Sequence, residues 1–313
     1  MLAWRQTIER RCGKRLRNAL PLLAALLGAC AATVPTHGWE DRLQGEAVVL
    51  LGEVHDNAQQ HRLRLALLRR ALAAGWRPAI AMEQFDRERQ IDIERARRER
   101  PNDAQHVIDL AAPARTPPGS GWNWDFYRPV VALALQYELP LVAANLSNAD
   151  TAKIVRGGYA AVFDSPSLAM LGLDQPIADD WQLAQEREID AGHCRALPPA
   201  MWPRLARAQF ARDAVMAQAL RRHAERGVVL VAGNGHVRRD IGVPRWLGID
   251  PARVFTVAYL EDTDGSTPVS AFDAAIRTEA AQRSDPCAGF NPPALAAAAA
   301  ARHAPTDAPR RAR

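Results

Sequence analysis

Short apolar runs alternate with longer amphipathic stretches through most of the chain. Five of the runs are expected to be strands, because each is a brief, almost continuous apolar segment of the kind that is buried on both faces of a sheet. They are Ala47–Leu51, Ala79–Met82, Leu141–Ala144, Val228–Ala232 and Val254–Ala258. Helical stretches lie between them, which is typical of a parallel sheet flanked by helices. The pattern therefore predicts an α/β fold with a mostly parallel sheet.

The first helix has recognisable signals at both ends. Asn57 caps its start, Gln60 stands three residues later as in a capping box, and Gly75 ends it after leucines at helical spacing. Further helices are expected at about 87–98, 126–137 and 203–226, with a turn-rich loop at 111–121. The segment Leu183–Pro199 is predicted to be a helical insertion in a single main domain over residues 43–286. Residues 287–313 are expected to be a disordered tail.

Residues 1–29 have the pattern of an export signal. A basic stretch up to Arg17 precedes the apolar run Ala19–Leu27, which is too short to span a bilayer stably. Small residues then stand before Cys30, which matches the lipobox of bacterial lipoproteins, in which acyl chains hold the protein on the membrane. We expect lipidation at Cys30 and a linker over residues 30–42. Because Ala31 and not Asp follows, we expect the outer membrane; a plain secretory signal with a chance cysteine is the alternative.

The basic charge of the chain is confined to that leading segment. The whole chain has a net charge of +5, and residues 1–29 hold six basic side chains and one acidic one, so the remainder is neutral. A protein that binds a phosphate backbone needs basic side chains on its folded part. The sequence therefore does not favour a nucleic-acid partner.

Two cysteines, Cys194 and Cys287, lie beyond the leading segment. An oxidising compartment permits a disulfide between them, but spacing in the sequence does not show whether their Cα atoms come within reach. A disulfide and two free thiols therefore both stay open.

Polar side chains follow three of the predicted strands directly. Glu53 and His55 come after the first strand, Glu83 after the second and His236 after the fourth. Because ligands bind at the carboxyl ends of strands in open α/β sheets, we predict that these four side chains converge on one rim. Both histidines stand in a Gly-x-x-His motif, GEVH and GNGH. Such a set suits a divalent metal, a general acid and base, or a cofactor pocket, although a strand-end histidine more often only caps a helix.

The segment Gly121–Pro129 concentrates aromatic side chains. Four of them lie within six positions, namely Trp122, Trp124, Phe126 and Tyr127. Such a segment either folds into the core or forms a flat wall for a planar ligand. In the second case Arg128 would pair with a carboxylate, and Tyr127 would offer a phenolate, which haem iron accepts as a ligand. Asn145, at the end of the third strand, would face the same rim.

His193 and Arg212 are further candidates. His193 lies beside Cys194 in a segment with little regular pattern, where it would meet a partner subunit or simply face solvent. Arg212 precedes Asp213 on a predicted helix, and such a pair is usually a structural ion pair.

Taken together, these segments resemble the ChaN-type haem-binding lipoprotein family of the Tiki-like superfamily. The matching elements occur in the family's order over about Leu50 to Val257, and they are LLGEVHDN..QH, AMEQF, GW.WDFY.P, LP.VAANL, HC..LP, QF.RD..MA and AGNGHVRRDIGVP. The resemblance implies an outer-membrane lipoprotein that binds haem, in which a dimer can enclose two stacked haems. It also implies a tyrosine ligand to the iron with a histidine close by, which we assign to Tyr127 and His193.

The first functional hypothesis is therefore haem binding for uptake or storage. Tyr127 or His193 would be the axial ligand, and an arginine would pair with the haem propionates. The remaining residues assigned to this pocket are Arg128, Arg212, Trp124 and Asn145.

The second hypothesis is a metal-dependent hydrolase, because other Tiki-like members are hydrolases that use Glu and His of Gly-x-x-His motifs. His55 and His236 would hold a divalent ion, with Glu53 or Glu83 as a further ligand or as the general base. A scaffold that keeps the fold without either activity is a third alternative.

Overall fold

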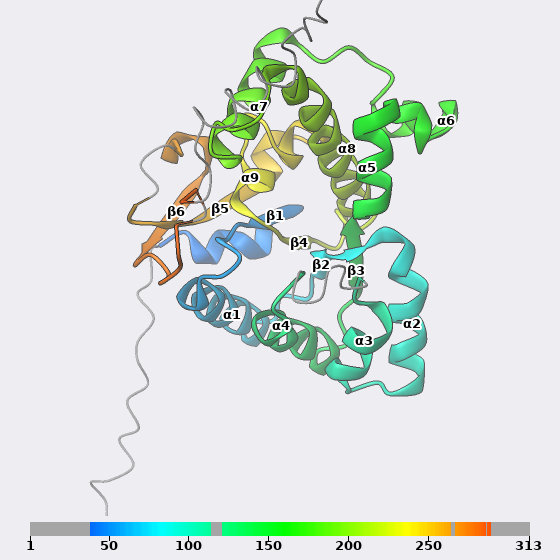
Figure 1. Cartoon of the computed structure of the whole chain (residues 1–313). Helices are drawn as coiled ribbons and strands as arrows, with labels where there is room; N and C mark the ends of the chain where they lie inside the picture. The colour runs from blue at the N-terminus through cyan, green and yellow to red at the C-terminus, as the bar shows by residue number, and fades with distance from the viewer. Residues whose placement is uncertain (1–37, 114–120, 264–266, 286, 289–313) are drawn as a thin grey trace, which may run out of the picture. The chain divides into compact units, whose positions relative to one another are not determined.

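The protein is a single α/β domain built on a six-stranded sheet, seen here in a computed structural model (Figure 1). The structure describes residues 38–113, 121–263, 267–285 and 287–288, so the predicted export signal, Cys30 and most of the predicted tail lie outside the described residues. The strands are β1 (Val48–Leu51), β2 (Ala79–Asp86), β3 (Leu141–Asn145), β4 (Val228–Val231), β5 (Val254–Glu261) and β6 (Ala274–Thr278). They pair in the order β3-β2-β4-β1-β5-β6, and every pair is parallel. The predicted α/β class is confirmed.

The five predicted strands correspond to β1 to β5. Every residue of β1, β4 and β5 is buried, which is why continuous apolar runs mark them in the sequence. β2 continues to Asp86, beyond the predicted end at Met82, so that Glu83 lies within the strand. β6 is not predicted, because most of its residues are only half-buried at the edge of the sheet and give no apolar run.

Two layers of helices cover the sheet (Figure 1). Val49 and Leu51 of β1 face a core formed with α1 (Ala58–Ala73), α2 (Gln90–Glu99), α3 (Ala104–Ala111) and α4 (Trp124–Gln136). Val48 and Leu50 face the opposite core, to which α5 (Asn148–Gly157), α6 (Ser165–Leu171), α7 (Asp179–Gly192), α8 (Trp202–Arg221) and α9 (Asn234–Val237) contribute. Successive residues of a strand point to opposite faces, so β1 supplies both cores.

Short 3-10 turns complete the connections. They are Glu40–Gly45, Arg87–Arg89, Tyr159–Ala161, Pro199–Met201, Val243–Trp246, Pro251–Arg253 and Val269–Ala271. Within the described ranges, no helix combines the length and the apolar composition needed to cross a membrane.

The start of α1 is capped as predicted, but not by a capping box. Asn57 Oδ1 accepts the N–H groups of Gln59 and Gln60 at 3.1 Å each. The predicted return bond from Gln60 to the Asn57 N–H is wrong, because that N–H already donates to the carbonyl of Val54 at 3.0 Å. Gln60 instead accepts the Val54 N–H at 2.7 Å and donates to Thr278 Oγ1 at 2.9 Å. The side chain therefore ties the loop after β1 to β6.

The predicted insertion Leu183–Pro199 is largely the second half of α7. This helix packs on α8 through Ile189 and through Trp181, whose ring contacts Phe210 at 5.2 Å between centroids. A disulfide joins Cys194, just after α7, to Cys287 beyond β6. The two cysteines that the sequence leaves open are therefore bonded, and they connect segments 93 residues apart.

Candidate functional site

The carboxyl ends of β1, β2 and β4 bring the four predicted rim residues together. His55 Nδ1 lies 2.9 Å from Glu53 Oε1, and His236 Nε2 lies 3.5 Å from Glu83 Oε1. The two pairs meet at Gly233, whose N–H donates to Glu83 Oε2 at 2.8 Å. Three separate segments of backbone thus form one cluster of two histidines and two carboxylates, as their positions after the strands predict.

Glycine is required where these segments approach one another. A Cβ at Gly233 would lie 2.9 Å from Cε1 of the His55 ring, so a larger residue would displace the histidine from the cluster. A Cβ at Gly52 would lie 2.2 Å from Oδ1 of Asn234. That amide oxygen also accepts the Tyr259 N–H at 3.3 Å. Both glycines of the Gly-x-x-His motifs therefore serve close packing between β1 and the loop after β4.

Glu53 is the buried centre of one half of the cluster. Its carboxylate accepts hydrogen bonds from Arg64 on α1, from the hydroxyl of Tyr127 on α4 and from His55. Burial lowers the pKa of Arg64 to about 10, so the guanidinium stays charged at neutral pH and neutralises the carboxylate. Burial raises the pKa of Tyr127, so its phenol stays protonated and donates. The His55 side chain is 48 % exposed, and in the neutral tautomer whose Nδ1 donates to Glu53 the lone pair is on Nε2.

His236 is the centre of the other half. Its Nδ1 lies 2.6 Å from Oδ1 of Asp213 on α8, and its Nε2 faces Glu83. Burial disfavours the charged ring, but the two carboxylates outweigh this effect and raise the pKa of His236 to about 10. Burial alone would raise the pKa of Glu83. The imidazolium of His236 outweighs burial and lowers the pKa of Glu83 to about 2. His236 is therefore an imidazolium held between acceptors on both of its nitrogens.

The aromatic segment does not form an exposed wall. Trp124 and Tyr127 are buried, and the Trp124 ring packs against Phe85 with 5.0 Å between centroids. Phe126 stacks on His61 at 4.5 Å. Only Trp122 reaches the rim, where its ring meets that of His55 edge-on at 4.7 Å. The N-terminal turn of α4 directs the Trp124 ring away from the rim and into the core, and the residue also lines a separate cavity of about 530 Å³ beside α3, so its assignment to a ligand pocket stays a prediction.

The two arginines that the sequence assigns to the haem propionates, Arg212 and Arg128, have different surroundings. Arg212 donates to Asn145 Oδ1 at 2.8 Å, to the Leu146 carbonyl at 3.1 Å and to Asn148 Oδ1 at 2.6 Å, so it holds the end of β3. It does not pair with Asp213, because neighbouring residues on a helix point apart and Asp213 binds His236. Asn145 is likewise engaged, since its Oδ1 also accepts the Leu146 N–H. Arg128 is exposed on α4 and pairs with Asp125 at 3.2 Å.

His193 lies at a small cavity beside the cluster. The cavity has a volume of about 230 Å³ and lies between α7, α8 and α9, with Asp213, Gly235 and His236 among its lining residues. The His193 Nδ1 donates to the carbonyl of Ile189 at 2.7 Å, since a carbonyl only accepts. In the neutral tautomer that this bond selects, Nε2 carries the lone pair, and the residue is exposed.

Comparison with models of protein families shows which family the chain belongs to. The model for haem-binding uptake proteins of the Tiki superfamily, ChaN, matches residues 39–247, which is more than half of the chain. The chain belongs to the ChaN family.

One solved structure agrees with this assignment at the level of the fold, and a second match is weaker. A structure of ChaN of Campylobacter jejuni, described as showing cofacial heme binding, is similar with a TM-score of 0.58 and 20% identity, over 75% of this chain and 88% of that one. A mutant of the erythromycin esterase EreC, in its open conformation, gives a TM-score of 0.42 and 12% identity over 71% of each chain. Among curated proteins the comparison finds no match.

Arg64 and Asp213 hold the cluster in place in this ChaN family member, whereas the sequence suggests Asp213 only as a partner of Arg212 and does not point to Arg64. Arg64 neutralises Glu53, and it shares the buried stripe of α1 with Leu68 and Leu72. Asp213 orients His236 from the buried side of α8, one turn after Phe210. Each is a charged residue followed three and four positions later by apolar residues, Leu67 and Leu68 after Arg64 and Met216 and Ala217 after Asp213. That pattern is visible in the sequence and marks a buried ion pair.

A metal centre has little support from the geometry of the cluster. Among the described residues, no group of three or more His, Cys, Asp and Glu side chains is arranged to hold a metal ion. The ring nitrogens of His236 both face carboxylates, and Nδ1 of His55 faces Glu53.

Proposed function

We propose that this protein is a haem-binding lipoprotein of the outer membrane that takes part in haem uptake or storage. The observation that carries the proposal is the match of residues 39–247 to the haem-binding ChaN family. The similar structure from Campylobacter jejuni supports it, because that protein is described as binding haem cofacially.

The membrane anchor is proposed from the sequence alone. Cys30 follows a short apolar segment and two small residues, the pattern that lipidation requires. Lipidation would leave acyl chains on the mature protein, each adding about 0.8 kcal/mol of membrane affinity per buried methylene. We expect radiolabelled palmitate to be incorporated by the full chain and not by Cys30→Ser, with the wild type in the outer-membrane fraction. Palmitate on Cys30→Ser, or a soluble wild-type protein, would contradict the anchor.

His193 is the iron ligand that the geometry favours. A haem ligand needs a free lone pair at an accessible place, and its other ring nitrogen is usually held by a hydrogen bond. His193 meets both conditions, with Nδ1 bound to Ile189 and Nε2 on an exposed residue. Tyr127 does not meet the first condition, because its side chain is fully buried and its hydroxyl donates to Glu53.

The size of the cavity beside His193 favours a dimer. Pockets that enclose a drug-sized ligand measure about 300–1,000 Å³, and a haem is at least as large as such a ligand. The cavity of about 230 Å³ is smaller, so a haem on His193 would lie across its mouth with one face uncovered. A second copy, with its own haem stacked on the first, would cover that face. Sedimentation should then report a monomer that dimerises when two haemins are added per dimer.

A haemin titration of the purified protein tests the function. We expect a saturable shift of the Soret band for the wild type and at least a tenfold weaker affinity for His193→Ala. His106→Ala is the matched control, because His106 lies on α3 and pairs with Glu99 at 2.7 Å, away from the cluster. A wild-type spectrum identical to that of free haemin would overturn the function. Unchanged affinity in a folded His193→Ala would overturn only the ligand assignment.

A hydrolase is the second candidate, favoured by the convergence of Glu53–His55 and Glu83–His236 at Gly233. His55 is its best general base, because Glu53 orients the ring and its Nε2 lone pair is accessible. If a divalent ion takes part, protein purified without chelator should contain it in stoichiometric amount and lose it in His55→Ala. Metal-free wild-type protein would contradict the metal-dependent form.

A further inference from the structure

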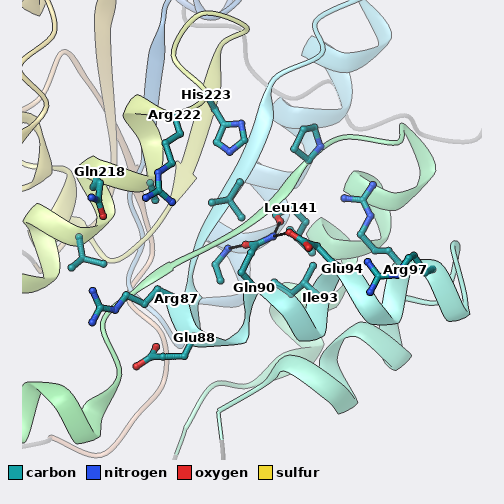
Figure 2. Close-up of a pocket in the computed structure, with 16 residues that line it drawn as sticks. Arg87, Glu88, Gln90, Ile93, Glu94, Arg97, Leu141, Gln218, Arg222 and His223 are labelled. Carbon is teal, nitrogen blue, oxygen red and sulfur yellow. Dashed lines mark hydrogen bonds between the residues drawn. The ribbon is translucent and has the colours of Figure 1, made fainter. Parts of the chain in front are cut away.

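A groove of about 940 Å³ runs along the outer edge of β3, and none of the four cluster residues lines it (Figure 2). Leu141–Ala143 of β3 form its floor. α2 supplies one wall, through Gln90, Ile93, Glu94 and Arg97, and the end of α8 supplies the other. β3 is an edge strand, since it pairs with β2 alone. The backbone groups on its other side therefore point into the groove.

The side chain of Gln90 occupies the place of a neighbouring strand. Its Nε2 donates to the carbonyl of Leu141 at 3.1 Å, and its Oε1 accepts the N–H of Ala143 at 2.8 Å (Figure 2). In a parallel ladder, one residue of the next strand makes this same pair of bonds, to residues two apart. The carboxamide is therefore a substitute for one residue of a parallel strand opposite Val142.

Arg97 covers the edge one step earlier. Its guanidinium donates to the carbonyl of Leu139 at 2.7 Å, so a second side chain from α2 takes a backbone acceptor on the approach to β3. Arg97 makes no ion pair with a carboxylate among the described residues, which leaves its charge uncompensated. An incoming strand would replace both side chains on the backbone and would release Arg97 to bind a carboxylate.

The charge of the residues that line the groove indicates which kind of incoming strand would bind there. Its lining holds four arginines against two glutamates, namely Arg87, Arg97, Arg98 and Arg222 against Glu88 and Glu94. Arg87 pairs with Asp150 at 3.6 Å, but Arg98 and Arg222 have no such partner within the described part of the chain. A second copy of this chain would bring a groove of the same sign, and like charges oppose that pairing.

We propose that this groove binds an extended acidic segment of a partner protein as a seventh, parallel strand beside β3. Main-chain bonds to Leu141 and Ala143 would give affinity, and the arginines would select acidic side chains. The amide of Gln90 competes for the same backbone groups and keeps the edge closed when the partner is absent. The proposal does not depend on haem binding.

Fluorescence anisotropy with synthetic peptides tests the groove. The probe is a labelled eight-residue peptide of alternating Glu and Thr, compared with one of alternating Lys and Thr, titrated into the full chain. We expect saturable binding of the acidic peptide alone. Gln90→Ala should bind it several-fold more tightly, because the competing amide is gone, and Arg98→Glu/Arg222→Glu should bind it at least tenfold more weakly. Arg62→Glu/Arg69→Glu, with both residues exposed on α1, is the matched charge control and should behave as the wild type.

Several results would overturn the proposal. The first is the absence of saturable binding of the acidic peptide by both the wild type and Gln90→Ala. The second is equal binding of both peptides, or binding that survives the reversal of Arg98 and Arg222. The third is dimerisation of Gln90→Ala without peptide, since the edge would then pair with a second copy. If binding occurs, amide hydrogen exchange at Leu141 must slow, because a peptide bound elsewhere in the groove would leave that N–H unprotected.

Discussion

Tyr127 on α4 donates its hydroxyl hydrogen to the carboxylate of Glu53, which follows β1, inside the core of the domain. The same carboxylate binds His55, whose ring is at the rim. A tyrosine from a helix on one face of the sheet thus fixes the orientation of a histidine at the carboxyl edge. The sequence assigns Tyr127 to haem iron, whereas the geometry gives its hydroxyl a positioning role.

The first prediction concerns that hydroxyl. Tyr127→Phe should lower the free energy of unfolding by about 1.5–3 kcal/mol, as expected for a lost hydrogen bond to a charged group. The Soret shift with haemin should stay that of the wild type. Urea unfolding and a haemin titration measure the two effects, and Tyr137→Phe, at the half-exposed end of α4, is the control. Loss of the Soret shift from a stable Tyr127→Phe would instead make Tyr127 the iron ligand.

The second prediction concerns the buried ion pair between Arg64 and Glu53. Arg64→Met should destabilise the domain by about 3–5 kcal/mol, because the Glu53 carboxylate is left buried and without its cation. Adding Glu53→Gln to it should recover part of that loss in urea unfolding, since no charge then remains uncompensated. Arg62→Met, at an exposed position of α1, should have little effect. A double variant less stable than Arg64→Met would argue against this account.

Much of the framework follows from local patterns in the sequence. Strands buried on both faces, such as β1 and β4, must be apolar throughout, so their positions and the rim after them are predictable. β6 is not, because an edge strand with half-buried residues needs no apolar run. Gln60 satisfies the spacing of a capping box, but β6 supplies Thr278 as a partner from 218 residues away, and local spacing contains no information about it.

The features of the site that the sequence does not predict also depend on contacts between distant parts of the chain. Trp124 and Tyr127 are residue types that could line a ligand pocket. They are buried instead because the packing of α4 against α1 decides which side of α4 faces the core. Arg212 and Asp213 are adjacent in sequence but bind different partners, Asn145 on β3 and His236 after β4. Long-range packing decides these choices, and a single sequence does not record it.

The third prediction is a pH dependence from Glu261 at the end of β5. Hydrogen bonds from Arg283 are the main reason why the pKa of Glu261 falls from 4.5 to about 2, and Asn57 and the Ala281 N–H add to the effect. A depressed carboxyl pKa stabilises the fold above the unfolded pKa, and the benefit is lost as the pH falls from about 4.5 to about 2. The stability difference between the wild type and Glu261→Gln should therefore shrink over that range. A difference that is constant between pH 6 and pH 3 would contradict it.

The fourth prediction concerns the disulfide that ties His193 to the C-terminal segment. Cys194 follows His193 directly and is bonded to Cys287, so the bond restrains the turn that carries the proposed iron ligand. Removing a native disulfide from a small secreted domain typically costs about 2–5 kcal/mol, and Cys287→Ser should lower the free energy of unfolding within that range. Its affinity for haemin should also fall, because a mobile His193 must be ordered on binding. Reductant should weaken the wild type to the level of Cys287→Ser and leave the variant unchanged, which separates the bond from side effects of the substitution. If reductant weakens both proteins equally, the disulfide has no part in placing His193.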